Sequence, residues 1–210
     1  MKRFIILVSL LGSSVCVNAQ RQIAEATIVY NIKGVAINGA ASTTVYLKGN
    51  SSRTEMVSAL GKEITIYNSK TENAVILKEF SGQKLMISLT RENWNTKNSL
   101  YRNIKFELSN DYKTIGIYRT RKAIAKTPDG KTFEVFYAPD LVAANKEYDA
   151  TFSNLPGLAI EYEIETGQMK FTYSLSNISY DSVQESLFDF PTSGYRVMTY
   201  DENQKLKKGN

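Results

Sequence analysis

Apolar and polar positions alternate through most of the chain from residue 24 onward, most clearly in residues 152–164, FSNLPGLAIEYEI. After the turn signal NLPG at 154–157, apolar side chains at 158, 160, 162 and 164 alternate with small or acidic ones, as in a half-buried strand. The turn dipeptide Thr166-Gly167 then leads into a second alternating run, from Met169 to Leu175. The two runs predict an amphipathic hairpin with one apolar face.

The apolar face of this hairpin has to rest on a core or on an apolar ligand, and the pattern fits both. A ligand would contact the largest side chains of that face. They are Leu158, Ile160, Tyr162, Phe171 and Tyr173.

Similar runs predict further strands along the chain, joined mainly by hairpin turns such as PDGK at 128–131. They include residues 27–33, 43–48, 53–57, 63–67, 74–80, 84–89 and 132–138. We expect about ten or eleven strands and no alternation of strands with long helices. This predicts a mainly β fold, a strongly curved antiparallel sheet or half-open β-barrel with few short helices.

Some stretches interrupt this pattern. Residues 90–100 lack a clear period and predict a short helix or a lid-like loop, in which Trp94 is more typical of a plug over a core edge than of a ligand-stacking residue. Asn110-Asp111 predicts a turn, and Gly116 predicts a bulge or a close backbone approach inside a strand at 113–119. Residues 180–187 predict a short helix, and residues 195–208 a frayed polar tail.

The first nineteen residues predict a secretory signal peptide. Lys2 and Arg3 precede an apolar run, and VNA at 17–19 offers a small-residue cleavage site before Gln20. The run is shorter than the roughly 20 residues that a spanning helix needs. We therefore expect residues 20–210 to form a single exported β domain with no transmembrane helix.

Cys16 leaves an alternative open, because a cysteine near the end of a signal can be lipidated and can anchor a protein to a membrane. The preceding SSV at 13–15 fits a bacterial lipobox poorly, which favours ordinary cleavage. Cleavage would remove the only cysteine, so the exported domain would be held by its core without a disulfide.

The composition argues against nucleic acid and against most enzymes. The net charge is +5, and cleavage would remove two of the basic residues, so the domain would be nearly balanced. The basic cluster of Arg119, Arg121 and Lys122 predicts a solvated patch, with a weak site for anionic lipid headgroups as the alternative. The chain has no histidine, which excludes a Ser-His-Asp triad, a Cys-His pair and a histidine zinc site.

No other motif predicts catalysis, a metal or a cofactor. Glu161, Glu163 and Glu165 share the polar face of one predicted strand, which is typical of a solvated surface rather than of an acid-base pair. The chain has thirteen tyrosines and nine phenylalanines, and their abundance is typical of β-sheets. The alternative interpretation is that some of them line an apolar pocket with polar groups at its mouth.

Two segments carry a family likeness: LPGLAIEYE at 155–163 and FPTSGYRVMTY at 190–200. They resemble an exported family of unknown function from Bacteroidetes, the GLPGLI-like proteins, which is distantly similar to the LolA/LolB lipoprotein-carrier fold. The GLPGLI motif has glycine where this chain has Asn154, and LolA-like carriers have larger helices than this sequence predicts. Arg53 is similar to the LolA arginine that holds the lid helices.

The resemblance implies a curved sheet or half-barrel in the periplasm or on the periplasmic side of the outer membrane, and it supplies no catalytic residue. It leads to the hypothesis of a non-enzymatic binding protein or carrier for an acyl chain, lipid or lipoprotein. The alternative is an interaction or structural module of the cell envelope, with a protein partner, a fully packed core and no small-molecule ligand.

Overall fold

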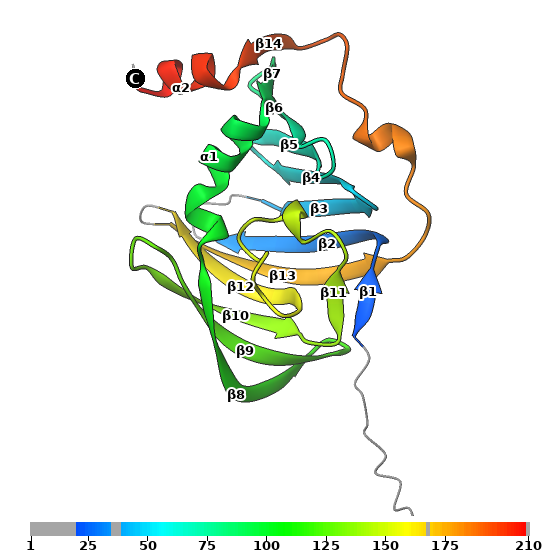
Figure 1. The fold of residues 1–210 in the computed structure, drawn as a ribbon, viewed down its shortest axis with the longest axis vertical. Coiled ribbons are helices and arrows are strands. Elements are labelled where there is room, and N and C mark those ends of the chain that lie inside the picture. The colour runs from blue at the N-terminus through cyan, green and yellow to red at the C-terminus, as the bar shows by residue number, and fades with distance from the viewer. Residues whose placement is uncertain (1–19, 35–38, 167–168, 209–210) are drawn as a thin grey trace, which may run out of the picture.

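A computed structural model describes residues 20–34, 39–166 and 169–208, and a twelve-stranded sheet dominates it (Figure 1). The order of neighbouring strands is β14-β7-β6-β5-β4-β3-β2-β13-β12-β10-β9-β8. Only β14 and β7 pair in parallel, and the other neighbours are antiparallel. The prediction of a mainly β, largely antiparallel fold is therefore confirmed.

The strands of this sheet are β2 (Glu25–Gly34), β3 (Ala41–Lys48), β4 (Ser51–Ser58), β5 (Gly61–Asn68), β6 (Asn73–Phe80), β7 (Gln83–Leu89), β8 (Lys105–Ile115), β9 (Tyr118–Lys126), β10 (Thr132–Ala138), β12 (Leu158–Thr166), β13 (Met169–Ser179) and β14 (Arg196–Thr199). A small parallel sheet pairs β1 (Arg21–Ile23) with β11 (Leu141–Ala143). Helices are few: α1 (Arg91–Arg102), α2 (Tyr200–Lys208) and the 3₁₀ turns η1 (Lys146–Tyr148) and η2 (Glu185–Phe188).

One face of the sheet, which we call the inner face, carries most of the core. Residues 139–157, which we call the cover segment, connect β10 to β12 and add Phe152 and Leu155 to the core cluster that contains Tyr162 and Ile160. The cover segment departs from β10 and returns to β12, and between these ends it lies over β13, β2 and β3, with η1 in contact with β4 (Figure 1). Much of the inner face is therefore packed by the chain itself.

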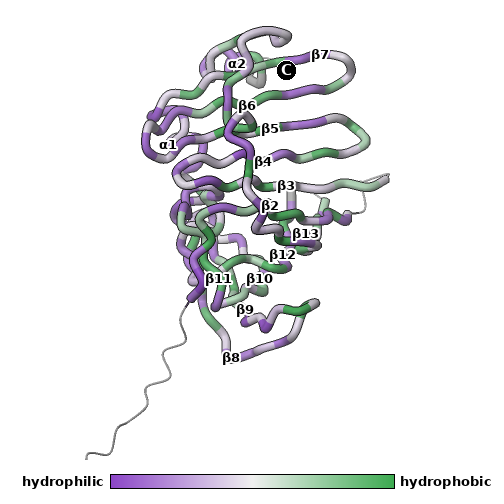
Figure 2. Tube along the Cα trace, turned by 90° about the vertical axis from the view of Figure 1, so that its right-hand side faces the viewer, coloured by the Kyte–Doolittle hydropathy of each residue, from purple (hydrophilic) through white to green (hydrophobic). Residues whose placement is uncertain are grey.

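Helix α1 lies on the same side of the sheet as β11 (Figure 2). Thr90 caps its first turn, with Asn93 completing a capping box, which explains a helix where the sequence shows no clear period. Trp94 stacks on Tyr67 of β5, with ring centroids 4.2 Å apart, and is buried. The interpretation of Trp94 as a plug over a core edge is therefore confirmed.

The outer face of β4–β7 is crossed by residues 180–195, which we call the strap. Its Phe188 and Tyr195 pack on a third core cluster, formed by Ile64, Ile66, Val75 and Leu77. The strap leads into β14 and α2, where the sequence predicts a polar tail. Met198 of β14 is buried in the cluster of Trp94, which explains why this end of the chain is ordered.

The predicted turn at Asn110-Asp111 is wrong, and so is the prediction for Gly116, which lies neither in a bulge nor close to another backbone segment. Strand β8 continues through Asn110-Asp111, where its register with β9 shifts between Leu108 and Tyr112. The chain instead turns at Gly116, whose φ of 59° is the left-handed conformation that glycine adopts at little cost. Asn and Asp are common both in turns between strands and at irregularities within a strand. Their presence therefore did not show which of the two occurs at residues 110–111.

The predicted hairpin is confirmed as β12 and β13, which pair from Glu161↔Ser174 to Thr166↔Met169. The signal peptide and Cys16 lie outside the described residues, as does Gly167 of the predicted hairpin turn. Within the described part of the chain, each helix is too short or too polar to span a bilayer.

Candidate binding site

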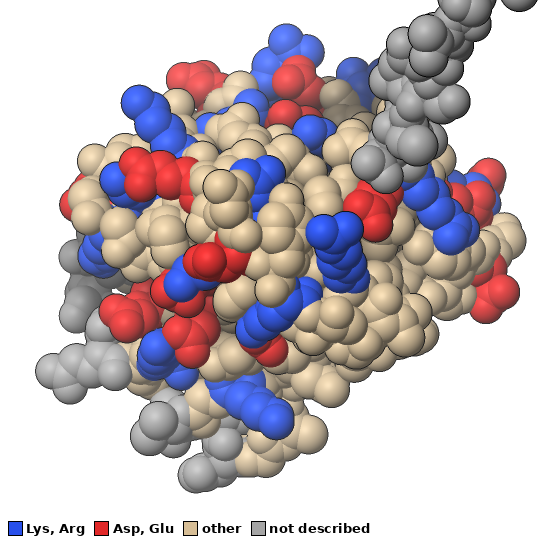
Figure 3. Space-filling view, turned by 90° about the horizontal axis from the view of Figure 1, so that it is seen from below, with Lys and Arg blue, Asp and Glu red and all other residues tan. Residues whose placement is uncertain are grey.

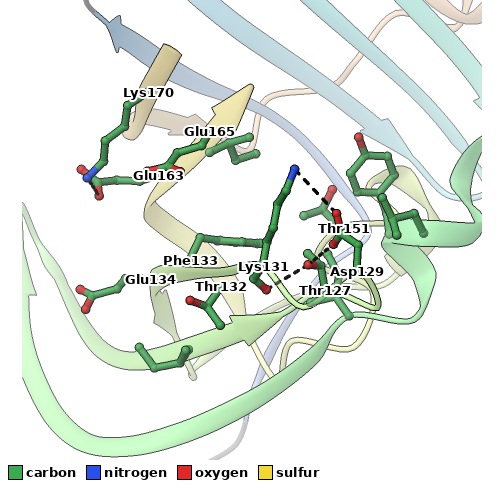
Figure 4. Close-up of a pocket in the computed structure, with 15 residues that line it drawn as sticks. Thr127, Asp129, Lys131, Thr132, Phe133, Glu134, Thr151, Glu163, Glu165 and Lys170 are labelled. Atoms are coloured by element: carbon green, nitrogen blue, oxygen red, sulfur yellow. Dashed lines mark hydrogen bonds and ion pairs between the residues drawn. The ribbon is translucent and has the colours of Figure 1, made fainter. Parts of the chain in front are cut away.

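Strands β10 and β12 pair over only part of their length, and a hollow lies where they part (Figure 4). Pairing extends from Ala138↔Leu158 to Val135↔Tyr162. Beyond that point Thr132, Phe133 and Glu134 pair only with β9, and β12 pairs only with β13. We call this hollow, with a volume of about 450 Å³, the slot.

The slot is lined by five parts of the chain: the end of α1, the two strands of the β9–β10 hairpin, its turn, the cover segment and the β12–β13 hairpin. The lining residues are Leu100, Tyr101, Ile104, Ile124, Thr127, Asp129, Lys131, Thr132, Phe133, Glu134, Thr151, Glu163, Ile164, Glu165 and Lys170. Apolar side chains form much of the wall and charged ones the rim, so the slot has the mixed character of a small-molecule site.

The floor of the slot is tied to the core through one aromatic contact. Phe133 meets Phe152 of the cover segment edge-on, with ring centroids 6.5 Å apart. Phe152 in turn packs edge-on against Tyr162 at 4.6 Å. The cover segment reaches the slot itself only with Thr151, so the apolar wall beyond Phe152 stays uncovered.

The cover segment is held in place by bonds to α1. Asn154 donates from Nδ2 to the carbonyl oxygens of Arg102 (2.8 Å) and Ile104 (3.2 Å). Arg102 donates from Nη2 to Glu147 Oε2 at 2.6 Å. Asn154, the position that differs from the GLPGLI motif, thus connects the start of the hairpin to the helix whose end lines the slot.

The β9–β10 turn fixes one side of the rim. The backbone N–H of Thr127 donates to the carbonyl oxygen of Lys131 at 2.9 Å, and the hydroxyl of Thr127 lies 2.9 Å from the same oxygen. The same hydroxyl donates to Asp129, and this hydrogen bond lowers the pKa of that carboxyl. Asp129 is therefore ionised at neutral pH, with Lys131 Nζ 3.7 Å away.

On the opposite side of the rim, one lysine faces two carboxylates. Lys170 Nζ lies 2.6 Å from Glu163, and the hydrogen bond to Glu163 raises the pKa of Lys170, with a smaller contribution from the charge of Glu165. Glu134 is paired with Lys122 at 2.6 Å, whereas Glu165 has no ion pair within the described residues. The rim thus carries more acid than base.

Charges elsewhere at this end of the molecule are interspersed. Figure 3 shows basic and acidic side chains beside one another on the face seen from below. Lys126 and Glu107, for example, pair at 2.5 Å between β9 and β8. The basic cluster predicted from the sequence divides, because Lys122 pairs with Glu134 while Arg119 and Arg121 flank the ring of Tyr112.

The residues predicted to bind an apolar ligand lie together but mostly inside the core. Leu158 and Ile160 are 1% and 0% exposed, and Tyr162 stacks on Tyr173 at 4.7 Å under Phe152. Phe171 is half-buried and pairs with Ile164 across the hairpin. None of the five lines the slot, so their binding of a ligand stays a prediction.

Two of the side chains that line the slot occupy the next inner-face positions along β12 and β10. Ile164 is the next apolar position after Tyr162 on β12, and Phe133 lies two residues before the buried Val135 on β10. Alternation could have identified both as inner-face residues. The contributions of Tyr101 and Thr151 had no sequence signal, because they depend on how α1 and the cover segment lie.

Arg53 holds the strap rather than a helix. It donates from Nη1 to the carbonyl oxygen of Leu187 at 2.9 Å and from Nε to Glu55 at 2.5 Å. Its cross-strand partner Ile66 lies on the outer face, under the strap, whereas α1 packs on the inner face. In this respect Arg53 differs from the lid-holding arginine to which it was likened.

No cluster of three or more His, Cys, Asp or Glu side chains suited to a metal ion is found in residues 20–34, 39–166 and 169–208. The lining of the slot consists of apolar side chains, ion-paired side chains and strand segments that the β10–β12 ladder does not include.

Fold and slot together define a mainly β protein built on one broad antiparallel sheet, with a hollow between two of its strands. No family model matches the chain, and neither does any curated protein. Among solved structures it is similar to PNGF-II in C2 and P21 space groups, with 13% and 14% identity, TM-scores of 0.54 and 0.52, and 87% of this chain covered. The chain spans about a third of PNGF-II, 32% and 33% in the two structures.

An uncharacterized conserved protein from Thermus thermophilus is a further, weaker match, with 9% identity, a TM-score of 0.48, and coverage of 84% of this chain and 91% of that one. Identities this low show a shared fold for PNGF-II and nothing about activity.

Proposed function

We propose that this protein is a non-enzymatic binding protein of the cell envelope that holds the apolar part of an amphiphile, such as an acyl chain, a lipid or a lipoprotein, in the slot. The observation that carries the proposal is the uncovered apolar wall between β10 and β12, formed by Phe133 and Ile164 on the inner face, with Ile124 beside the carboxylates of the outer rim. A volume of about 450 Å³ is in the range of small-ligand pockets, roughly 300–1,000 Å³.

The finer description of the sheet as a half-open, LolA-like barrel belongs to the same proposal. In that description the slot is a lateral opening through which an apolar group enters. Export to the periplasm, or to the periplasmic side of the outer membrane, is part of the proposal and rests on the signal-like residues 1–19. Catalysis is left out because the chain has no histidine and the rim carboxylates Glu134 and Glu163 are engaged by lysines.

The test is binding of an uncharged fluorescent apolar probe, N-phenyl-1-naphthylamine, to the purified exported domain. We expect saturable fluorescence enhancement, and native mass spectrometry of protein taken from the periplasm should show a bound amphiphile. Ile164→Trp fills the slot and should weaken probe binding about tenfold or more, because the probe loses the space it occupies.

Leu60→Trp is the matched control, since it adds the same side chain at an 80% exposed turn position outside the slot. Probe binding that is equal in the two variants, or a clean apo mass with no probe uptake by the unaltered protein, would overturn the proposal.

A second candidate function, an interaction module without a small ligand, is favoured by the packed inner face. Phe152 and Leu155 fill the space above Ile160 and Tyr162 with the chain's own side chains. The fold also occurs as about a third of a longer chain in PNGF-II, as modules do. Crosslinking in the cell envelope should then capture a defined protein partner, and Ile164→Trp should leave that partner bound.

A further inference from the structure

The slot exposes strand edges inside the sheet, where edges are normally paired. Thr132, Phe133 and Glu134 use one edge to pair with β9, and the residues of β12 beyond Tyr162 use one edge to pair with β13. The ladder between β10 and β12 does not extend to these residues. Backbone N–H and C=O groups on such edges are ready to pair with another extended chain.

The side chains beside these edges are sorted by face. Phe133 and Ile164 belong to the inner face, because they lie two residues from the buried Val135 and Tyr162. Glu134 and Glu163 alternate with them and point to the outer face, as does Glu165. A strand lying in the slot would therefore meet Phe133 and Ile164 on its inner face, and carboxylates beside Ile124 on its outer face.

The negative charge of the outer rim indicates which residues the incoming strand should carry on its outward-facing side. Lys170 pairs with Glu163 at 2.6 Å, and Glu165 lacks an ion pair within the described residues. A lysine or arginine on the incoming strand, placed directly opposite or diagonally, would complete these pairs. A free carboxylate such as that of a fatty acid would meet repulsion there.

We propose that the amphiphile taken by the slot is an extended peptide segment with alternating apolar and basic residues, which adds a short strand between β10 and β12. This inference rests on the proposed function of the slot as a binding site and names its ligand class. Backbone hydrogen bonds to the free edges provide affinity, Phe133 and Ile164 receive the apolar side chains, and Glu163 and Glu165 receive the basic ones.

The experiment compares blocked hexapeptides by fluorescence anisotropy at low ionic strength. A peptide of alternating lysine and valine should bind at least about tenfold tighter than its glutamate-valine counterpart, because only the former matches the rim. The lysine-valine peptide methylated at alternate backbone nitrogens should lose binding, since it keeps its side chains but cannot pair with the strand edges. Hydrogen exchange at Phe133 and Ile164 should slow on binding.

Glu165→Lys should abolish the preference for lysine, whereas Glu185→Lys, the same charge change on the exposed strap, should preserve it. Equal binding of the lysine and glutamate peptides, or full binding of the methylated peptide, would overturn the inference. N-phenyl-1-naphthylamine separates the two proposals. A slot that binds this probe and no peptide contradicts the peptide inference alone, and a slot that binds neither contradicts both.

Discussion

Strands β10 and β12 each have a paired half and a parted half, and the two halves carry the same sequence pattern with different outcomes. In the paired half, Tyr162 lies under Phe152 and is only 8% exposed. In the parted half, Ile164 and Phe133 continue the same inner-face positions but line the slot. The alternation of apolar and polar residues is therefore the same in the core and in the candidate site, and it does not distinguish the two.

The difference comes from the cover segment and not from the strands. It supplies Phe152 and Leu155 above the paired half, and at the parted half it contributes only Thr151. Its position depends on Asn154 and Glu147, which bond to the end of α1. The cover segment, whose sequence has little strand or helix pattern, thus determines which part of the apolar face is core and which part lines the slot.

The strongest test of this comparison removes one aromatic ring from each half. Phe152→Ala should lower the free energy of unfolding by about 3–5 kcal/mol, because it leaves a cavity against Tyr162. Phe133→Ala should cost no more than about half as much, since one side of Phe133 already faces the slot. Urea unfolding of both variants measures this, and equal losses would mean that the halves are packed alike.

A smaller effect is expected where the cover segment rejoins the sheet. A Cβ at Gly157 would lie 2.3 Å from the carbonyl oxygen of Ala138 and 2.6 Å from the ring of Tyr137, so Gly157→Ala must push β12 away from β10. Such crowding typically costs about 1–3 kcal/mol. The neighbouring change Pro156→Ala adds no atom there and serves as the control. If both variants unfold at the same urea concentration, the paired half is less tightly packed than its geometry indicates.

Much of the fold followed from the sequence because strand pairing depends on local alternation. The hairpin of β12 and β13, with Tyr162 opposite Tyr173, was predicted from its period of two and its turn signal. The interpretation of Pro156-Gly157 as a structural turn agrees with the close approach of Gly157 to β10. The position of Gly116 in a turn depended on its positive φ, which the sequence left open.

The site residues predicted from the sequence lie on β12 and β13, whereas the slot lies between β12 and β10, a strand that the predicted site did not include. Leu158, Ile160 and Tyr162 were chosen because they are the most regular part of the apolar face, and regularity also makes them the easiest residues to bury. The slot lies one step further along, at Ile164, where the pairing with β10 ends. The residue at which the pairing of two strands ends is set by contacts between distant segments, such as the hydrogen bond from Asn154 to Ile104. Such contacts leave no local pattern in the sequence.

The finest test concerns the charge inside the cover segment. Burial raises the pKa of Asp149, although hydrogen bonds from Thr151 and the charge of Lys97 oppose this. The native protein therefore binds this proton more tightly than the unfolded chain does. Stability from this group is fully present below the ordinary carboxyl pKa and is lost as the pH rises through the raised value.

Asp149→Asn removes this titration and keeps an oxygen that can accept from the backbone N–H of Thr151, a bond of 2.9 Å in the native protein. Relative to the unaltered protein, the variant should therefore gain stability between about pH 4 and pH 7, by less than the Gly157 change costs. Urea unfolding at both pH values gives the difference. If that difference does not change with pH, Asp149 is hydrated in the native state, and water reaches further under the cover segment than its packing on Tyr162 indicates.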